Sequence, residues 1–133
     1  MLSRAPTLRS LDLSNTPVTD EGLKHLAPLT NLRNLSLAST QVDGSGLAAL
    51  HHAPWLRRLL LADTNLSDDG LARLAAVPRL EILDLSGTRV TDDAIVHLKK
   101  MPSLRQLNLR DTAIDEAAVA ELQAALPACA IAL

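Results

Sequence analysis

The sequence contains almost no aromatic residues: Phe and Tyr are absent, and Trp55 is the only tryptophan. Any hydrophobic core must therefore be aliphatic, and 29 of the 133 residues are Leu. Cys129 is the only cysteine, which excludes an intramolecular disulfide and a metal site built from several cysteines. We therefore expect a reducing, cytoplasmic setting for this chain.

The chain also lacks an excess of positive charge. Lys and Arg number 13 against 15 Asp and Glu, which gives a formal net charge of −2. This balance argues against a polybasic protein that binds nucleic acid or a membrane surface. No segment is long and apolar enough to span a bilayer. With 47% hydrophobic residues the chain is too apolar to be disordered, so we expect a folded protein. From the charge balance and the lack of a spanning segment, we expect neither nucleic acid nor a membrane as a partner.

What the sequence does contain is an internal repeat of 24 residues that begins at Leu8. We divide the single domain 1–133 into five complete repeats, 8–31, 32–55, 56–79, 80–103 and 104–127, flanked by partial repeats 1–7 and 128–133. A period of this length is typical of a solenoid, in which each unit packs only against its neighbours.

Each repeat predicts one strand and one short helix. The first part reads L-x-x-L-x-L, so that alternate residues such as Leu11 and Leu13 lie on one face of a short strand. A residue with N-cap chemistry follows, often with acids after it, and then apolar residues spaced for one face of a helix. These N-cap candidates are Thr19, Asp43, Ser67, Thr91 and Asp115. A strand and a helix in 24 residues predict an α/β solenoid of parallel strands, with the helices on the outside.

The pattern resembles the leucine-rich repeat family, whose unit reads L-x-x-L-x-L-x-x-N-x-L. The tails VTDEGL, LSDDGL and VTDDAI are similar to the T-D-x-G-L variant of bacterial repeats and of the cysteine-containing repeats in ubiquitin-ligase substrate receptors. The resemblance implies a right-handed solenoid with parallel strands on a concave face and short helices on a convex face. The ladder position, usually Asn or Cys in the family, is Thr in all five copies: Thr16, Thr40, Thr64, Thr88 and Thr112.

Two columns of identical or similar residues have a structural explanation. The threonines stand where the chain turns inward after a strand, and a hydroxyl there can satisfy backbone groups that are away from water. The second column consists of small residues, which we expect to let each helix approach the sheet closely: Gly22, Gly46, Gly70, Ala94 and Ala118.

No group of residues predicts catalysis, a metal site or a cofactor. His25 and His97 are three repeats apart, and we expect the neighbours His51 and His52 to point in different directions. The acidic pairs recur at helix starts, where the helix dipole favours them, and no loop alternates oxygen ligands as a calcium site does. Cys129 lies in an apolar segment without a histidine partner, which favours a structural thiol. We therefore expect that the protein is not an enzyme.

The residues between the core leucines of each strand must point away from the helices and form the concave face. The candidate partner-binding residues on this face are Asp12, Asn34, Ser36, Arg58, Leu60, Ile82, Asp84, Gln106, Asn108 and Arg110. Arg58, Leu60, Ile82 and Asp84 form a block in which two aliphatic side chains lie beside opposite charges. One interpretation is a binding hot spot, because apolar area with directional charges gains energy when a partner excludes water. The other is an Arg58–Asp84 pair that satisfies itself over incidental hydrophobic residues.

A further column precedes the strands and is mostly basic: Arg9, Arg33, Arg57, Glu81 and Arg105. It could form a rim for an anionic partner. We favour a solubilising edge, interrupted by Glu81, whose charges are offset by the acids at the helix starts.

These observations predict a non-enzymatic protein-protein interaction module that binds its partner on the concave face. The alternative is a structural segment of a larger leucine-rich repeat protein, an effector or a substrate receptor of the ubiquitin-ligase type, whose main recognition surface lies outside this chain. The apolar run Ala128 to Leu133 also predicts weak end-to-end association between copies of the chain.

Overall fold

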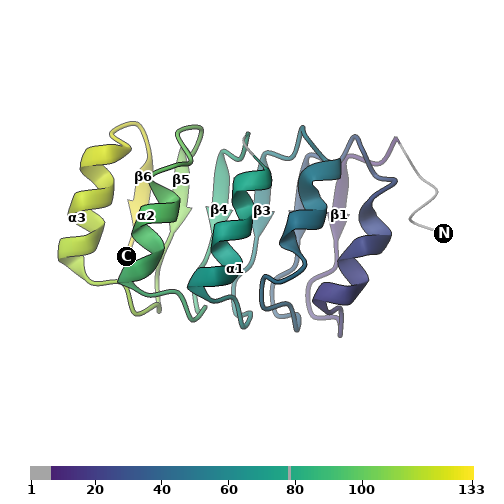
Figure 1. The fold of residues 1–133 in the computed structure, drawn as a ribbon, viewed down its shortest axis with the longest axis horizontal. Helices are drawn as coiled ribbons and strands as arrows, with labels where there is room; N and C mark the ends of the chain where they lie inside the picture. The colour runs from purple at the N-terminus through teal and green to yellow at the C-terminus, as the bar shows by residue number, and fades with distance from the viewer. Residues whose placement is uncertain (1–6, 78) are drawn as a thin grey trace.

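The computed structural model describes residues 7–77 and 79–133, so most of the partial repeat 1–7 lies outside the described residues. One sheet of six parallel strands runs through them in the order β1-β2-β3-β4-β5-β6 (Figure 1). The strands are β1 (Ser10–Asp12), β2 (Asn34–Ser36), β3 (Arg58–Leu60), β4 (Ile82–Asp84), β5 (Gln106–Asn108) and β6 (Ala130–Ala132). The sheet is open, and the helices cover one side of it, as in the predicted leucine-rich repeat solenoid.

The helices are short, and several are 3₁₀-helices. They are η2 (Asp20–Leu26), η3 (Leu47–His52), α1 (Asp68–Ala72), η4 (Arg73–Ala76), η5 (Asp92–Ala94), α2 (Ile95–Leu98) and α3 (Glu116–Ala125). Within the described residues, no helix has the length and apolar content that a bilayer span requires.

The register of the sheet stacks equivalent residues of successive repeats. Leu35 of β2 pairs with Leu59 of β3, which in turn pairs with Leu83 of β4. All three side chains are buried, while the residues on either side of them are exposed or half-buried. The middle of each three-residue strand therefore points into a core made largely of leucine, and the flanking positions point away from the helices. We call that outward side of the strands the sheet face.

The turn after each of the strands β1 to β5 contains a residue in the left-handed region of backbone conformation. The five positions are Asn15 (φ 59°), Ser39 (φ 56°), Asp63 (φ 56°), Gly87 (φ 67°) and Asp111 (φ 57°). They recur every 24 residues, directly before the Thr column. Asn, Asp and Gly tolerate this conformation better than other residues, so the composition of the turn agrees with its geometry at every position except Ser39.

Three of the five predicted N-caps act on their own helix. Ser67 accepts a hydrogen bond from Gly70 N, Thr91 from Asp93 N and Asp115 from Ala118 N. Thr19 stands at the N-cap of η2 without a side-chain cap bond. The prediction for Asp43 is wrong, because η3 begins only at Leu47, with Gly46 as its N-cap.

The carboxylate of Asp20, one repeat earlier, explains this late start. It accepts hydrogen bonds from Asp43 N (2.7 Å), Gly44 N (3.1 Å) and Gly46 N (2.8 Å). With Gly44 at φ 104°, the chain wraps around this carboxylate before the helix begins. Two other acids also reach the next repeat: Asp68 accepts from Thr91 N at 2.8 Å, and Asp92 accepts from Asp115 N at 2.9 Å. These acids therefore connect repeats in addition to facing a helix start.

At Gly46 and Gly70 the small residue serves the contact between repeats, which corrects our expectation of a helix-to-sheet role at these two positions. A Cβ on Gly46 would lie 2.5 Å from the carbonyl oxygen of Asp20, and a Cβ on Gly70 would clash with the carbonyl oxygen of Asp43. Both obstacles belong to the preceding repeat. At Gly22, in the first complete repeat, the nearest atom lies 3.8 Å away. Close approach of successive repeats is therefore what limits side-chain size at Gly46 and Gly70.

Candidate functional site

The predicted hot spot lies in the middle of the sheet face. Arg58 and Leu60 on β3 stand directly beside Ile82 and Asp84 on β4. Arg58 is exposed and the other three are half-buried, so two large aliphatic side chains remain partly open to solvent between charged ones. Arg58 and Leu60 also line two hollows on this face, one toward β1 and one toward β6. They therefore stand where the two hollows meet.

Arg58 and Asp84 do not form an ion pair. Within residues 7–77 and 79–133 the ion pairs are Lys24–Glu21, Arg57–Glu81 and Lys99–Glu121. Asp84 instead accepts hydrogen bonds from Ser86 N at 2.9 Å and Ser86 Oγ at 2.7 Å. The interpretation of the block as a self-satisfied pair therefore has no counterpart in the structure.

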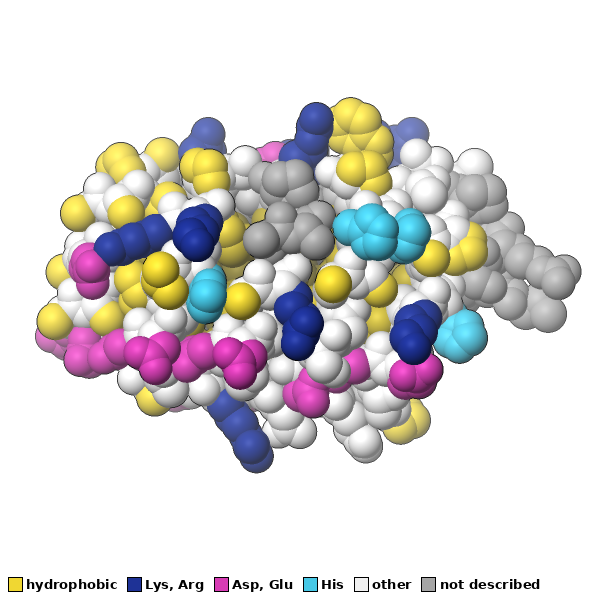
Figure 2. Space-filling view, in the orientation of Figure 1, with side chains coloured by type: hydrophobic (Ala, Val, Ile, Leu, Met, Phe, Trp, Pro, Cys, Tyr) yellow, Lys and Arg dark blue, Asp and Glu magenta, His cyan; other side chains and the backbone are white. Residues whose placement is uncertain are grey.

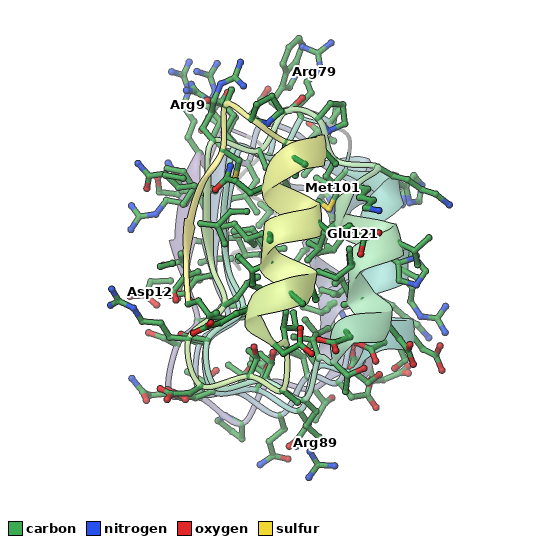
Figure 3. The ribbon with its side chains drawn as sticks, turned by 90° about the vertical axis from the view of Figure 1, so that its left-hand side faces the viewer. Arg9, Asp12, Arg79, Arg89, Met101 and Glu121 are labelled. Carbon is green, nitrogen blue, oxygen red and sulfur yellow. The ribbon has the colours of Figure 1, made fainter. Side chains whose placement is uncertain are left out.

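Asp12 repeats this arrangement on β1. Its Oδ1 accepts from Ser14 N at 2.9 Å and from Ser14 Oγ at 2.5 Å. The hydroxyl of Ser14 first, and its backbone N–H second, lower the pKa of the Asp12 carboxyl below its usual value. Figure 3 shows Asp12 on the strand side of the molecule, away from the helices. The sheet face thus presents two carboxylates, Asp12 and Asp84, each held by hydrogen bonds from the serine two residues later.

The remaining candidates surround the block. Asn34 donates from Nδ2 to Ser10 Oγ at 3.0 Å, and Asn108 accepts from Arg110 N at 3.0 Å. Ser36 lines the hollow toward β1, and Gln106 lines the hollow toward β6. Arg110, which follows β5, lines neither hollow. Nine of the ten predicted residues therefore border these two hollows, while Arg110 lies beside them.

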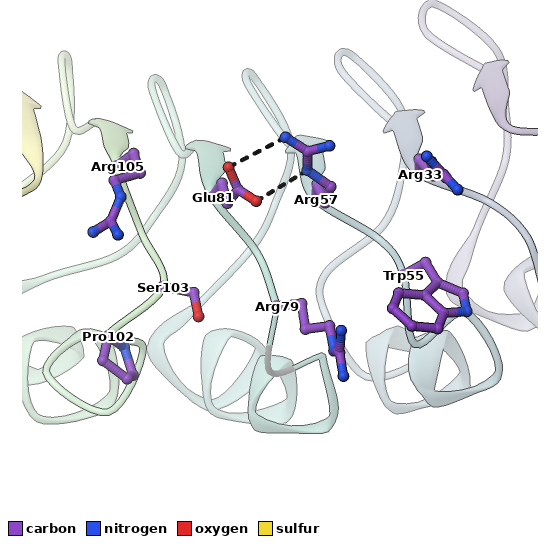
Figure 4. Close-up of a pocket in the computed structure, with 8 residues that line it drawn as sticks. All are labelled: Arg33, Trp55, Arg57, Arg79, Glu81, Pro102, Ser103 and Arg105. Carbon is purple, nitrogen blue, oxygen red and sulfur yellow. Dashed lines mark hydrogen bonds and ion pairs between the residues drawn. The ribbon is translucent and has the colours of Figure 1, made fainter.

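A third hollow lies at the edge of the sheet where the strands begin (Figure 4). Its lining residues are Arg33, Trp55, Arg57, Arg79, Glu81, Pro102, Ser103 and Arg105. The guanidinium of Arg79 lies 4.4 Å from the ring centroid of Trp55. Our sequence analysis missed Arg79, although the 24-residue spacing from Trp55 to Arg79 places them at the same position of successive repeats. We call this set of arginines, together with Arg9, the basic edge.

The acids at the helix starts do not offset the charges of the basic edge. Figure 3 places Arg9 and Arg79 together at one edge of the molecule, and Arg89 at the opposite edge. Asp and Glu side chains gather along the helix face toward that opposite edge, where the helices begin (Figure 2). Our expectation of mutual compensation is therefore wrong, because strand and helix starts lie at opposite ends of each repeat.

The histidines and the cysteine form no metal site in the part of the chain that the structure describes. His51 and His52 do not diverge as we expected, since their ring centroids lie 3.9 Å apart in the last turn of η3. Cys129 is buried, and burial raises the pKa of its thiol, partly opposed by the charge of Arg105. A buried thiol with a raised pKa is a poor nucleophile.

The sequence comparison agrees with the architecture. The model of the family described as Leucine Rich repeat matches residues 4–27, 29–50 and 52–75, which is more than half of the chain. The protein therefore belongs to the leucine-rich repeat family. No curated protein sequence matches it.

Solved structures with the same fold include bacterial leucine-rich repeat proteins. An internalin (inlF) from Listeria monocytogenes superposes with a TM-score of 0.77 at 23% identity, over 98% of this chain and 36% of that one. The Leptospira interrogans LRR protein LIC12759 superposes with a TM-score of 0.71 at 15% identity, over 98% of this chain and 38% of that one. Internalin C2 from Listeria monocytogenes superposes with a TM-score of 0.65 at 28% identity, over 91% of this chain and 50% of that one. The chain thus spans between about a third and a half of the length of these proteins.

Proposed function

We propose that the chain is a non-enzymatic protein-binding module whose partner docks on the sheet face, centred on Arg58 and Leu60. Leucine-rich repeat proteins are in general protein-interaction modules. The observation that carries the proposal is the absence of an ion pair between Arg58 and Asp84 among the described residues, which leaves the guanidinium available to a partner. A free arginine beside half-buried aliphatic side chains has the composition of an interface hot spot.

The mechanism is rigid display. The positions of the sheet-face residues are fixed by the register of six strands and by a core of stacked leucines. A partner that docks there orders little of this protein, so less conformational entropy opposes binding. The bound segment would cover Leu60 and Ile82 and place a carboxylate or a carbonyl against Arg58.

A double variant tests the site. Affinity capture from the native host first identifies the partner, and the affinity of the purified pair is then measured by calorimetry. Arg58→Glu combined with Leu60→Asp removes the donor and the apolar anchor, so we expect binding to be lost. Because both positions point toward solvent, the free energy of unfolding should change by about 1 kcal/mol or less.

Lys100→Glu combined with Val96→Asp is the matched control. It makes the same two kinds of change on the helix face, where Val96 is 54% exposed. This control should bind as the parent does. If the control loses binding and the sheet-face variant keeps it, the partner binds along the helices and the proposal is wrong.

The length of the related structures favours a second candidate. Each of them is at least twice as long as the segment that this chain matches. On this reading the chain is a structural segment of a larger leucine-rich repeat protein, and the main recognition surface lies on other repeats. Loss of binding in the Arg58→Glu, Leu60→Asp variant would argue against it. We also propose a reducing, cytoplasmic setting, which cell fractionation would test.

A further inference from the structure

The basic edge is a separate charged surface, distinct from the sheet face. Four of the residues that line its hollow are arginines, and Glu81 is the only acid among them. Glu81 is engaged by Arg57, with Nε 2.9 Å and Nη2 3.4 Å from its carboxylate oxygens. No carboxylate of the described residues forms an ion pair with Arg33 or Arg105, and both side chains are exposed. The hollow therefore carries uncompensated positive charge.

Trp55 gives this surface an ordered apolar element. The side chain is 48% exposed, although it is the largest hydrophobic group in the chain, and Arg79 lies over its ring. Stacking holds both groups in place and leaves the edge of the guanidinium free to donate hydrogen bonds. A partner can therefore contact the exposed part of the indole and reach a preoriented arginine at the same time.

We infer that the basic edge binds an extended acidic segment of a protein, with carboxylates on Arg33 and Arg105. These arginines precede β2 and β5, three strand spacings apart, which is roughly 14 Å. In an extended peptide the side chains at positions i and i+4 project on the same side about 13 to 14 Å apart. A segment with acids at positions i and i+4 therefore matches the distance between these two arginines, and arginine can bind each carboxylate through two hydrogen bonds.

The charge distribution favours an acidic peptide over nucleic acid. The chain as a whole carries a net charge of −2, which disfavours a long polyanion that would extend beyond the hollow. Stacking of bases needs free aromatic faces, whereas one face of Trp55 is covered by Arg79. A short peptide, in contrast, can bind within the length of the hollow.

The experiment uses two synthetic peptides without aromatic residues. One has the sequence Gly-Glu repeated four times, and the other has Gln in place of each Glu. Because Trp55 is the only tryptophan and no Tyr or Phe is present, its emission reports directly on the hollow. We expect the Glu peptide to change this emission and to bind in calorimetry, more weakly as salt is raised, and the Gln peptide to do neither.

Arg33→Gln combined with Arg105→Gln should weaken binding of the Glu peptide at least tenfold. The control combines Arg73→Gln with Arg89→Gln, two exposed arginines of another hollow that make the same change in net charge. Arg89 lies at the opposite edge (Figure 3). This control should bind as the parent does, and circular dichroism should show equal melting temperatures for the parent and both variants.

Three results would overturn the inference. The Glu peptide could fail to bind, the control could weaken it as much as the Arg33→Gln, Arg105→Gln variant, or a ten-nucleotide oligothymidine could bind more tightly than the peptide. A Leu60→Asn variant separates this surface from the proposed function. It removes the anchor on the sheet face without a change of charge, and it should leave the affinity for the Glu peptide unchanged.

Discussion

The turn after each of the strands β1 to β5 is closed by one hydroxyl. Thr16, Thr40, Thr64, Thr88 and Thr112 each donate from Oγ1 to the carbonyl oxygen of the residue three positions earlier, at 2.6 to 2.8 Å. The three central threonines are buried, whereas Thr16 and Thr112 are half-buried. At Thr64 the oxygen also accepts from Leu66 N at 3.4 Å. The column therefore satisfies backbone groups within each repeat, which explains why a polar residue is kept at a buried position.

Thr64→Val should destabilise the protein by roughly 1 to 3 kcal/mol, because the valine leaves the carbonyl oxygen of Leu61 without its buried donor. Thr16→Val should cost less, since water can reach that half-buried position. Chemical denaturation of both variants would measure the difference. Equal stability of Thr64→Val and the parent would remove the structural role of the column.

Gly70→Ala should also destabilise by roughly 1 to 3 kcal/mol, through a clash rather than a lost hydrogen bond. The added Cβ would meet the backbone of Asp43 and of Gly44 in the preceding repeat, and backbone atoms cannot move aside as a flexible side chain can. Gly22→Ala is the matched control, because only Val18 lies within 4 Å there. Thermal melting should show a lower Tm for Gly70→Ala and an unchanged or higher Tm for Gly22→Ala. The opposite order would disprove the explanation by contact between repeats.

At the scale of elements, each repeat depends on its neighbour as much as on its own local preferences. Adjacent strands exchange backbone hydrogen bonds, such as Leu37 N to Leu60 O at 2.8 Å. On the other side of the strands, the carboxylates of Asp20, Asp68 and Asp92 accept from the start of the following repeat. One side of the unit is thus joined by the sheet and the other by acids that cap the next turn.

Asp20→Ala should destabilise the protein by roughly 1 to 3 kcal/mol, because the three backbone N–H groups in the turn around Gly44 lose their acceptor. Asp69→Ala serves as the control, since this exposed acid also lies in the first turn of a helix but makes no hydrogen bond to the next repeat. Urea unfolding should separate the two variants. A cost for Asp69→Ala equal to that for Asp20→Ala would mean that only the helix dipole matters.

The strands could be predicted from the sequence because alternation and the 24-residue period are both visible in one chain. The start of η3 could not, because it depends on Asp20, an acceptor in a different repeat. The left-handed turn positions can be predicted from the sequence, because Asn15, Asp63 and Asp111 recur in register and are residue types that tolerate this conformation. Local sequence preferences predict the structure within one repeat. Contacts between repeats can be predicted only when the alignment of neighbouring repeats is known.

The candidate site shows the same division. Alternation along β3 and β4 places Arg58, Leu60, Ile82 and Asp84 on one face. It does not tell whether Arg58 pairs with Asp84 or whether the carboxylate turns to Ser86, because the competing hydrogen bond is local and depends on the turn that follows the strand. The opposite placement of basic and acidic edges follows from the topology, since helices begin where strands end.

At the scale of the whole molecule, the two ends of the solenoid differ from its middle. Leu11 and Leu13 of the first complete repeat are half-buried, whereas their equivalents Leu35 and Leu37 are buried. At the other end, β6 pairs with β5 in the order of the sheet, and Leu133 is 48% exposed. Apolar side chains and strand edges of this kind favour contact between copies of the chain.

The 133-residue chain should therefore self-associate weakly, and more so at higher concentration. Sedimentation velocity would show this as a sedimentation coefficient that rises with protein concentration. Leu133→Lys should shift this association to higher concentration, because it places a charge beside the edge of β6. Val96→Lys introduces the same charge at a comparably exposed position, 54%, on α2 in the helix face, and should leave the association unchanged. A strict monomer over a wide range of concentration would contradict the prediction, and an equal effect of Val96→Lys would place the contact along the helices instead of at the ends.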